Sequence, residues 1–243
     1  MTDSDSHTWV AGADGCRAGW FVVLRAVNGE ACRRRVVPDV EALLDLPEAP
    51  GILGVDMVIG LPGEARSGGR ACDRQARQLL GWPRSSSVFS PPAQAALAAE
   101  TYAEAQRLNR AHSPDDVGIT KQTFHLFPKL RALDRRMTPE RQQRIREVHP
   151  ECAFFAMNGD APTEHSKHTD TGRAERRQLL EANGFGEIGA VLQEWRSSDL
   201  GADDILDAHA VCWTAQRIRA GTAQRCPSDP PRNDRGLRME IWR

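Results

Sequence analysis

The feature that most constrains this chain is the segment 9–24, in which two runs of strand-forming residues are joined by a turn rich in glycine. Gly12, Gly15 and Gly19 interrupt the apolar residues, a pattern that predicts a β-hairpin. Asp14 ends the first run. A carboxylate there is costly to bury unless a cation or hydrogen-bond donors meet it. Taken alone, an Asp-Gly pair is also an ordinary hairpin turn.

The composition is that of a globular chain without signals for export or membrane insertion. The 243 residues, 40% of them hydrophobic, are enough for one large domain or for a domain that carries an insertion. No run of about 18 apolar residues occurs, and the polar start at 1–8 lacks the apolar core of a signal peptide. The six cysteines are scattered without a Cys-x-x-Cys pair, which favours reduced thiols. We therefore expect a cytoplasmic protein with no membrane association and no structural zinc.

The charge is nearly balanced but unevenly distributed. A formal net charge of −1 does not mark the whole chain as a nucleic-acid-binding protein. Basic residues gather between 121 and 146, whereas the segment 199–207 is acidic. A solvated helix face is the simpler explanation of the basic run taken alone. A basic surface beside an acidic site would nevertheless suit a polyanionic substrate held by metal ions.

A second apolar run, at 51–62, repeats the pattern that surrounds Asp14. It carries one carboxylate, Asp56, and is otherwise apolar, as expected for a central strand that is covered on both faces. Between the hairpin and this run, the sequence predicts a third strand at 31–37 and an amphipathic helix at 38–44. Three antiparallel strands, a helix and a parallel central strand are thus expected in that order.

Residues 62 to about 140 predict a mainly helical insertion. One helix is expected to end near Gly81, with Arg70 and Arg77 on one face, and a second helix is expected to run from 93 to 109. The insertion is a candidate surface for homodimerisation.

The segment 145–151 predicts the last strand of the sheet. Its pattern stops at Pro150, which leaves Glu151 just past the strand end. Further along, His165 and His168 have a spacing that suits a metal ion, but a polar loop is expected to leave them solvated.

A helix predicted at 203–218 supplies the decisive pattern. One face of this helix is apolar except for Asp204 and Asp207. Favourable interaction with the helix dipole explains acidic residues in the first turn, but Asp207 lies further inside, on the side expected to pack. With Asp14 and Asp56, four carboxylates are expected to converge. Their mutual repulsion would require divalent cations between them.

The order of these elements resembles the ribonuclease H-like fold, and Asp204-x-x-Asp207-Ala208 looks like the closing motif of Holliday-junction resolvases in that superfamily. Along nearly its full length the sequence is similar to the bacterial domain-of-unknown-function family 429, described as predicted nucleases of this fold. The resemblance implies an α/β protein with a mixed five-stranded sheet, three antiparallel strands followed by parallel strands, flanked by helices. It also implies a single domain over 1–243, with the helical insertion at about 62–140. The matching segments are 12–20, 55–62, 70–77, 86–89, 128–129, 147–151, 166–169, 203–208 and 213–215.

The resemblance further implies a metal-dependent nuclease that hydrolyses phosphodiester bonds with two Mg²⁺ or Mn²⁺ ions. Asp14 would bridge the two ions, and Asp56 and Asp207 would each complete one of them. Asp204 or Glu151 would supply a further ligand or orient the water. Five basic residues are candidates for contacts with the phosphates of nucleic acid, each with a surface salt bridge as the alternative explanation: Arg17, Arg70, Arg77, Lys129 and Lys167.

Two other functions remain open from the sequence. A phosphotransferase or ATPase-like protein would share the core hairpin and an Asp-Gly turn, but such proteins repeat the core and no second Asp-Gly hairpin occurs here. A non-catalytic module that binds nucleic acid would keep the fold with a decayed site. The presence of all four acids argues against decay.

Overall fold

The computed structural model describes residues 8–243, and the polar start at 1–7 lies outside the described residues. The chain forms two compact units. The first, here called the core unit, contains the segment that ends at Met57 together with 144–224 and 242–243. The second unit contains 58–143 and 225–241. The predicted insertion at about 62–140 therefore falls within the first segment of the second unit.

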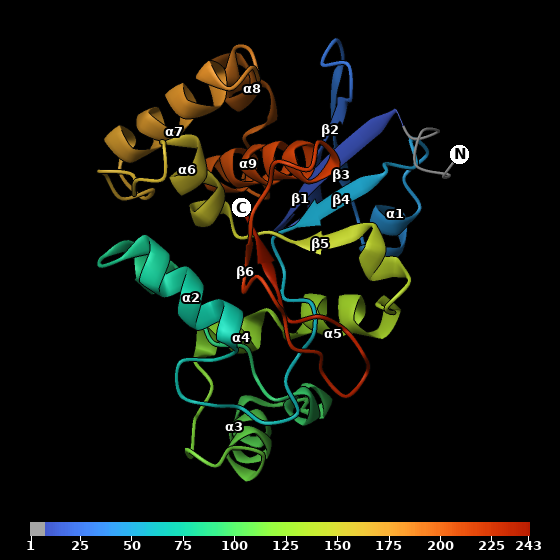
Figure 1. Ribbon diagram of the computed structural model, residues 1–243, viewed down its shortest axis with the longest axis vertical. Helices are drawn as coiled ribbons and strands as arrows, with labels where there is room; N and C mark the ends of the chain where they lie inside the picture. Colours follow the sequence, from blue (N-terminus) through green and yellow to red (C-terminus); the bar gives the residue numbers. More distant parts are fainter. Residues whose placement is uncertain (1–7) are drawn as a thin grey trace. The chain divides into compact units, whose positions relative to one another are not determined.

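Within residues 8–243, five strands form a mixed sheet in the order β3-β2-β1-β4-β5 (Figure 1). The β1–β2 and β2–β3 pairs are antiparallel, whereas the β1–β4 and β4–β5 pairs are parallel. This arrangement confirms the expected α/β fold and is consistent with the ribonuclease H-like class. The strands are β1 Trp9–Cys16, β2 Gly19–Ala26, β3 Cys32–Val37, β4 Ile52–Val55 and β5 Ile145–Glu147.

The turn between β1 and β2 depends on glycine. Gly19 has a φ of +130°, and a Cβ atom added there would lie 2.1 Å from the carbonyl oxygen of Val37. A side chain is therefore excluded both by the backbone conformation and by the neighbouring strand. This turn fixes the hairpin register in which Asp14 pairs with Phe21.

The helices of the core unit cover the sheet, with α9 in contact with β1 and β4. Figure 1 shows α6 and α7 on the other side of α9 from the sheet, whereas Trp195 of α8 packs against Phe21 of β2, with ring centroids 5.6 Å apart. Side chains such as Phe21, Phe154 and Ile205 are fully buried in the hydrophobic core of this unit. The helices are α1 Val40–Leu44, α6 Pro150–Met157, α7 Asp170–Ala182, α8 Ile188–Trp195 and α9 Ala202–Arg219.

The second unit is mainly helical. Its C-terminal segment is tied to the rest of the unit by the Asn233 side chain, which donates to the Leu61 carbonyl oxygen at 2.9 Å. Gln142 donates likewise to the carbonyl oxygen of Arg238 at 2.7 Å. Its helices are α2 Ala71–Leu80, α3 Tyr102–Ala111, α4 Lys121–His125 and α5 Phe127–Arg136. The short strands β6 Arg225–Cys226 and β7 Ile241–Trp242 pair with each other, and the second residue of β7 already belongs to the core unit.

One sequence prediction of an element is wrong, and one predicted strand is longer than the strand observed. The expected helix at 93–109 is a short 3₁₀ helix, Gln94–Ala98, followed by a separate helix, α3. The break occurs where the Thr101 side chain accepts a hydrogen bond from the Glu104 backbone and starts the new helix. The strand predicted to begin at 145 and to stop at Pro150 is present as β5, but it already ends at Glu147, and Pro150 begins α6, which contains Glu151.

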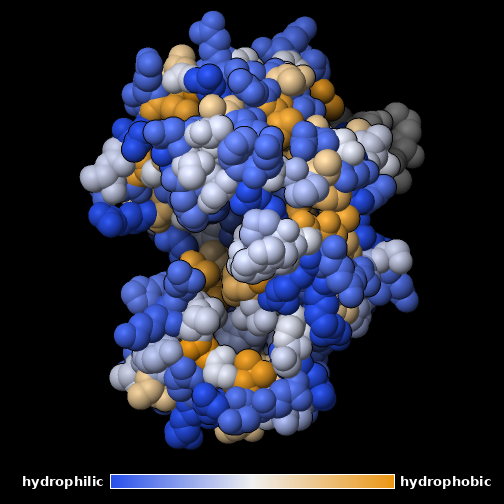
Figure 2. Space-filling model, turned by 90° about the vertical axis from the view of Figure 1, so that its left-hand side faces the viewer, coloured by the Kyte–Doolittle hydropathy of each residue, from blue (hydrophilic) through white to orange (hydrophobic). Residues whose placement is uncertain are grey.

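The surface of the protein is largely hydrophilic on the face that Figure 2 shows, with hydrophobic residues in small patches. Among the described residues, no helix combines the length and the apolar character needed to span a membrane.

A candidate metal centre

Strand pairing places Asp14 beside Asp56. Ala13 of β1 pairs with Val55 of β4 in parallel register, and the Asp56 backbone N–H donates to the Ala13 carbonyl oxygen at 2.9 Å. Asp14 directly follows Ala13, and Asp56 directly follows Val55, the last residue of β4. Because parallel strands end at the same edge of a sheet, the two carboxylates lie together at that edge.

Glycines bring α9 onto the same face of the sheet. Gly12 and Gly54 each precede an aspartate by two residues, so they share its face of the strand. A Cβ atom on Gly12 would lie 2.1 Å from the Cys212 backbone nitrogen, and one on Gly54 would lie 2.8 Å from Cγ1 of Val211. The helix therefore packs directly against the strand backbones. Asp207, about one turn before these residues, reaches the strand ends as a result.

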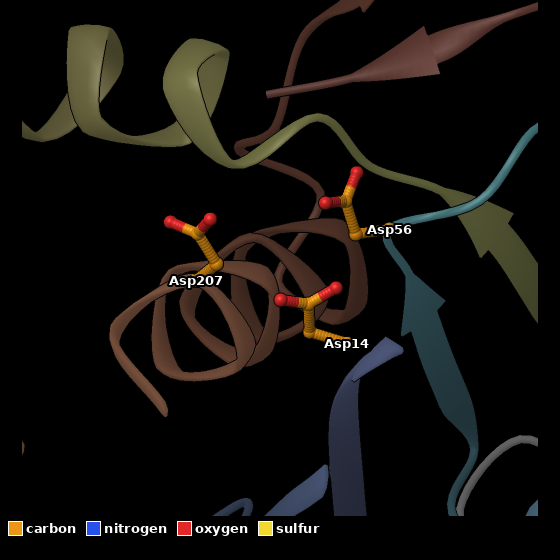
Figure 3. A group of neighbouring side chains, drawn as sticks. All are labelled: Asp14, Asp56 and Asp207. Atoms are coloured by element: carbon orange, nitrogen blue, oxygen red, sulfur yellow. The ribbon is translucent and has the colours of Figure 1, made fainter. Parts of the chain in front are cut away.

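Asp14, Asp56 and Asp207 form one acidic cluster. Each offers a carboxylate oxygen, and these oxygens all lie within 4.8 Å of one another. Figure 3 shows the three side chains coming from the end of β1, from the residue after β4 and from α9, and pointing toward a shared space. Asp14 is 8% exposed and Asp207 3% exposed, while Asp56 is half-buried. The cluster is thus shielded from water yet rich in negative charge.

Burial and mutual repulsion perturb the acids of the cluster. Loss of solvation raises the pKa of Asp14 well above its ordinary value, and the charges of Asp56 and Asp207 raise it further. Burial, followed by the charge of Asp207, raises the pKa of Asp56 to about 8. A group of carboxylates that resists ionisation by itself is a group that a divalent cation would stabilise in its ionised form.

Lys167 already supplies one positive charge to the cluster. Its Nζ donates to Oδ2 of Asp207 at 2.8 Å. The charge of Asp207 raises the pKa of this ammonium group despite the burial that opposes it, and Asp56 and Asp14 add to the effect. The lysine therefore stays protonated and neutralises part of the charge of the three aspartates.

Two further acids lie near the three aspartates. Oδ2 of Asp204 accepts from the Gly201 backbone N–H at 2.8 Å and so caps α9, and burial raises the pKa of the carboxyl. Glu147 on β5 is 6% exposed, and its charge contributes to the raised pKa of Asp56. Sequence reasoning did not select Glu147. The signal that would have found it is the β4–β5 register, in which Glu147 pairs with Val55.

Glu151 forms hydrogen bonds with Arg176 and Thr163, which do not belong to the acidic cluster. It lies in the first turn of α6, where both of its carboxylate oxygens accept from Arg176, at 2.8 and 2.9 Å. Thr163 donates to it as well, at 3.2 Å. Both members of the ion pair are buried. These contacts give Glu151 a structural role in joining α6 to α7.

The five predicted phosphate contacts lie in different environments. In the core unit, Lys167 belongs to the acidic cluster, while Arg17 is exposed and lies 3.8 Å from Asp199. In the second unit, Arg70 is buried in an ion pair with Asp73 at 2.7 Å.

The remaining two also belong to the second unit. Arg77 donates to the Val88 carbonyl oxygen and to Ser90, and Lys129 lies half-buried on α5. Arg70 and Arg77 thus have internal partners that explain them without a ligand.

The histidines of the polar loop pair with different acids. Nδ1 of His165 lies 3.5 Å from Glu175, and Nδ1 of His168 lies 3.4 Å from Asp203. Their first partners are thus carboxylates on different helices.

The family described as "Protein of unknown function (DUF429)" matches residues 12–232. The chain belongs to this family. No curated protein and no solved structure gives a significant match. The family description assigns no activity, so the chemistry of the DUF429 chain has to be argued from the acidic cluster itself.

The donor atoms of the cluster fit a hard divalent cation. All three side chains are carboxylates, and oxygen ligands suit Mg²⁺ and Mn²⁺ better than metals that prefer thiolate or imidazole. Their spacing lets one ion contact more than one carboxylate. The cluster could therefore bind a metal, which would also relieve the repulsion that raises the pKa values of Asp14 and Asp56.

Proposed function

We propose that this DUF429 protein is a metal-dependent phosphodiesterase that hydrolyses nucleic acid with Mg²⁺ or Mn²⁺. The observation that supports this most strongly is the convergence of Asp14, Asp56 and Asp207 from three distant parts of the chain. Sheet, register and helix packing all serve to bring these carboxylates together. Clusters of this kind hold the cations of two-metal phosphodiester hydrolysis.

Each acidic residue would have a distinct role in metal binding or in orienting the water. Asp14, near the end of β1, would bridge two ions, with Asp56 and Asp207 each completing one. Asp204 has one carboxylate oxygen outside its capping bond and would supply a further ligand or orient the water. When bound, the ions would activate the attacking water and stabilise the leaving oxygen of the phosphodiester.

Lys167 would contribute a positive charge from the chain itself. Its ammonium group lies at Asp207, at the border of the cluster. A phosphate drawn to the bound ions would approach this same charge, which would offset the negative charge of its oxygens. Glu151, whose oxygens are taken up by Arg176, has the weaker case for a direct role.

The test is a calorimetric titration of Mn²⁺ into the wild-type protein and Asp14→Asn, followed by incubation with labelled DNA and RNA strands. We expect the wild type to bind Mn²⁺ and to cleave a strand only when metal is present. Asp14→Asn should keep its fold and lose both properties. Asp229→Asn changes an exposed aspartate of the second unit in the same way and should behave as the wild type.

Three results would contradict the proposal. Hydrolysis at the wild-type rate in Asp14→Asn would remove the cluster from the reaction. Mn²⁺ binding without cleavage of any strand would favour a non-catalytic module. ATP binding with phosphoryl transfer to another acceptor would favour the phosphotransferase class instead.

A further inference from the structure

A groove of about 580 Å³ lies in the core unit between α7, the end of α8 and the start of α9. Its size is within the range of clefts that bind small ligands or parts of larger ones. Three arginines and a single acid, Asp170, supply the charged groups of its lining. The arginines are Arg173, Arg177 and Arg196.

The three arginines are arranged along the groove by local structure. Arg173 and Arg177 are four residues apart on α7, so their side chains leave the same face of the helix. Arg196 is the C-cap residue of α8. Leu192 and Ala202 contribute apolar surface to the same lining. The groove therefore carries three positive charges against the single negative charge of Asp170.

The acids near these arginines hold them weakly. Arg173 contacts Asp170 at 2.5 Å, but the Asp170 side chain is fully exposed. Arg177 lies 3.8 Å from Glu181, and both side chains are more than a third exposed. Exposed ion pairs of this kind contribute little free energy. The arginines can therefore turn to an anionic ligand at small cost.

The groove is connected to the acidic cluster through Lys167. Arg173 donates to the backbone carbonyl oxygen of Lys167 at 3.5 Å, and Lys167 donates to Asp207. Ala202, which lines the groove, lies five residues before Asp207 on α9. Five residues correspond to about 8 Å along a helix axis, so the groove and the cluster both lie near the start of α9.

We infer that this groove binds the phosphate backbone of a nucleic-acid strand and delivers the adjoining phosphodiester to the acidic cluster. The inference rests on the proposed function and names the part of the surface that holds its substrate. A strand, rather than a single phosphate, fits the observations because the arginines are spread over two helices. Guanidinium groups bind phosphate oxygens in a planar, bidentate manner without reading the base. The binding is therefore independent of sequence.

The experiment measures binding of a fluorescent single strand of about 20 nucleotides, longer than the usual site sizes of single-strand binding proteins. Fluorescence anisotropy is recorded in EDTA over a range of salt concentrations, so that no metal is needed and no cleavage occurs. The wild type is compared with the triple variant Arg173→Gln, Arg177→Gln, Arg196→Gln. Arg107→Gln, which changes an exposed arginine of α3, is the matched control.

We expect the triple variant to bind the strand at least ~10-fold more weakly at low salt, with the slope of log affinity against log salt smaller by about 2. Three lost phosphate contacts at ~0.7 each give that change in slope. Arg107→Gln should match the wild type in affinity and in slope. Circular dichroism and Mn²⁺ titration should give wild-type values for the triple variant, because none of its three arginines belongs to the acidic cluster.

Unchanged affinity and slope in the folded triple variant would overturn the inference. Inorganic phosphate that binds the groove as tightly as the strand does would overturn it too, by showing a small-anion site. A wild-type protein that binds the strand through these arginines but takes up no Mn²⁺ would uphold the groove and reject the proposed hydrolysis. The two proposals therefore fail in distinguishable ways.

Discussion

At the scale of single residues, the acidic cluster costs stability when no metal is bound. The pKa of Asp56 is about 8 in the folded protein, against an ordinary value of 3.8, and the pKa of Asp14 is raised as well. The folded state therefore holds protons that the unfolded state has released. The contribution of these two acids to stability is therefore fully present below the ordinary value of 3.8 and is lost as the pH rises toward 8. The loss is on the order of 3 kcal/mol after allowance for partial solvation.

We therefore expect Asp14→Asn to stabilise the metal-free protein at pH 8, because it removes a buried carboxyl group that in the folded protein must either ionise beside Asp56 and Asp207 or hold a proton that the unfolded state releases. Its free energy of unfolding should also depend less on pH between 4 and 8. Urea unfolding in EDTA across this range measures both quantities, with Asp229→Asn as the control. A variant less stable than the wild type at pH 8 would mean that the cluster is not strained by its charge.

Lys167 is expected to compete with the metal. Its ammonium group forms an ion pair with Asp207 and repels an incoming cation. With well-screened charges, this repulsion lowers the binding free energy of the cation by about 1 kcal/mol. Lys167→Gln should therefore bind Mn²⁺ roughly five-fold more tightly, in line with that energy. Hydrolysis should slow at the same time, since a charge beside the phosphate is lost. Calorimetry and a cleavage assay separate the two effects.

The control for this variant is Lys121→Gln, which removes an exposed lysine at the start of α4. It should alter neither quantity. Weaker Mn²⁺ binding by Lys167→Gln would show that the lysine organises the carboxylates rather than competing with the cation.

At the scale of elements, the contact between α9 and the sheet positions the site. Gly12→Ala would place a methyl group 2.1 Å from the Cys212 backbone nitrogen and 2.6 Å from the Ala208 carbonyl oxygen. Backbone atoms cannot move aside as a flexible side chain can, so the helix would be displaced. We expect a loss of about 3 kcal/mol or more in the free energy of unfolding.

Thermal and urea unfolding measure this loss, and Mn²⁺ titration of the fraction that folds should show weakened binding. Gly189→Ala is the matched control, because its added methyl group would meet only an Arg177 side-chain atom at 3.6 Å. The control should be neutral or slightly stabilised, since alanine favours a helix. Equal effects of the two substitutions would contradict a special role for Gly12.

The sequence predicts the elements of the core unit well because their signals are local. The hairpin is marked by its glycines, and α9 by a long apolar face that contains two acids. The helix expected at 93–109 was wrong because helix-favouring composition outweighed a visible start signal, Thr101 followed three residues later by Glu104. The last strand was correctly predicted to stop before Pro150, but it ends at Glu147, and the start of α6 at Pro150 was not predicted, although proline is common in the first turn of a helix.

The site is predictable in part for the same reason. Asp14, Asp56 and Asp207 interrupt apolar patterns, and that conflict is visible in the sequence. The position of Glu147 depends on strand register, and the pairing of Glu151 with Arg176 joins residues 25 positions apart. The three-arginine groove joins the ends of separate helices. No local pattern encodes such contacts, because they arise only when the chain has folded.

At the scale of the whole molecule, the acidic cluster joins parts of the chain that the sequence separates widely. Asp14, Asp56 and Asp207 come from β1, the end of β4 and α9, and a cation bound by all three would exist only in the folded state. Metal binding should therefore raise the free energy of unfolding by about 2.7 kcal/mol when free Mn²⁺ is 100-fold above its dissociation constant. Thermal unfolding at increasing Mn²⁺ should show a midpoint that keeps rising with concentration.

The same titration distinguishes Mn²⁺ binding at the acidic cluster of the folded protein from binding to other carboxylates of the chain. Asp14→Asn should begin with a higher midpoint than the wild type at pH 8 in EDTA, and then gain little from Mn²⁺. Plotted against Mn²⁺ concentration, the melting midpoints of the two proteins should therefore cross. The substitution relieves the repulsion among the three aspartates and at the same time removes the central metal ligand. Parallel rises in both proteins would place the Mn²⁺ elsewhere on the chain. A flat response in both would show that the aspartates serve the fold alone.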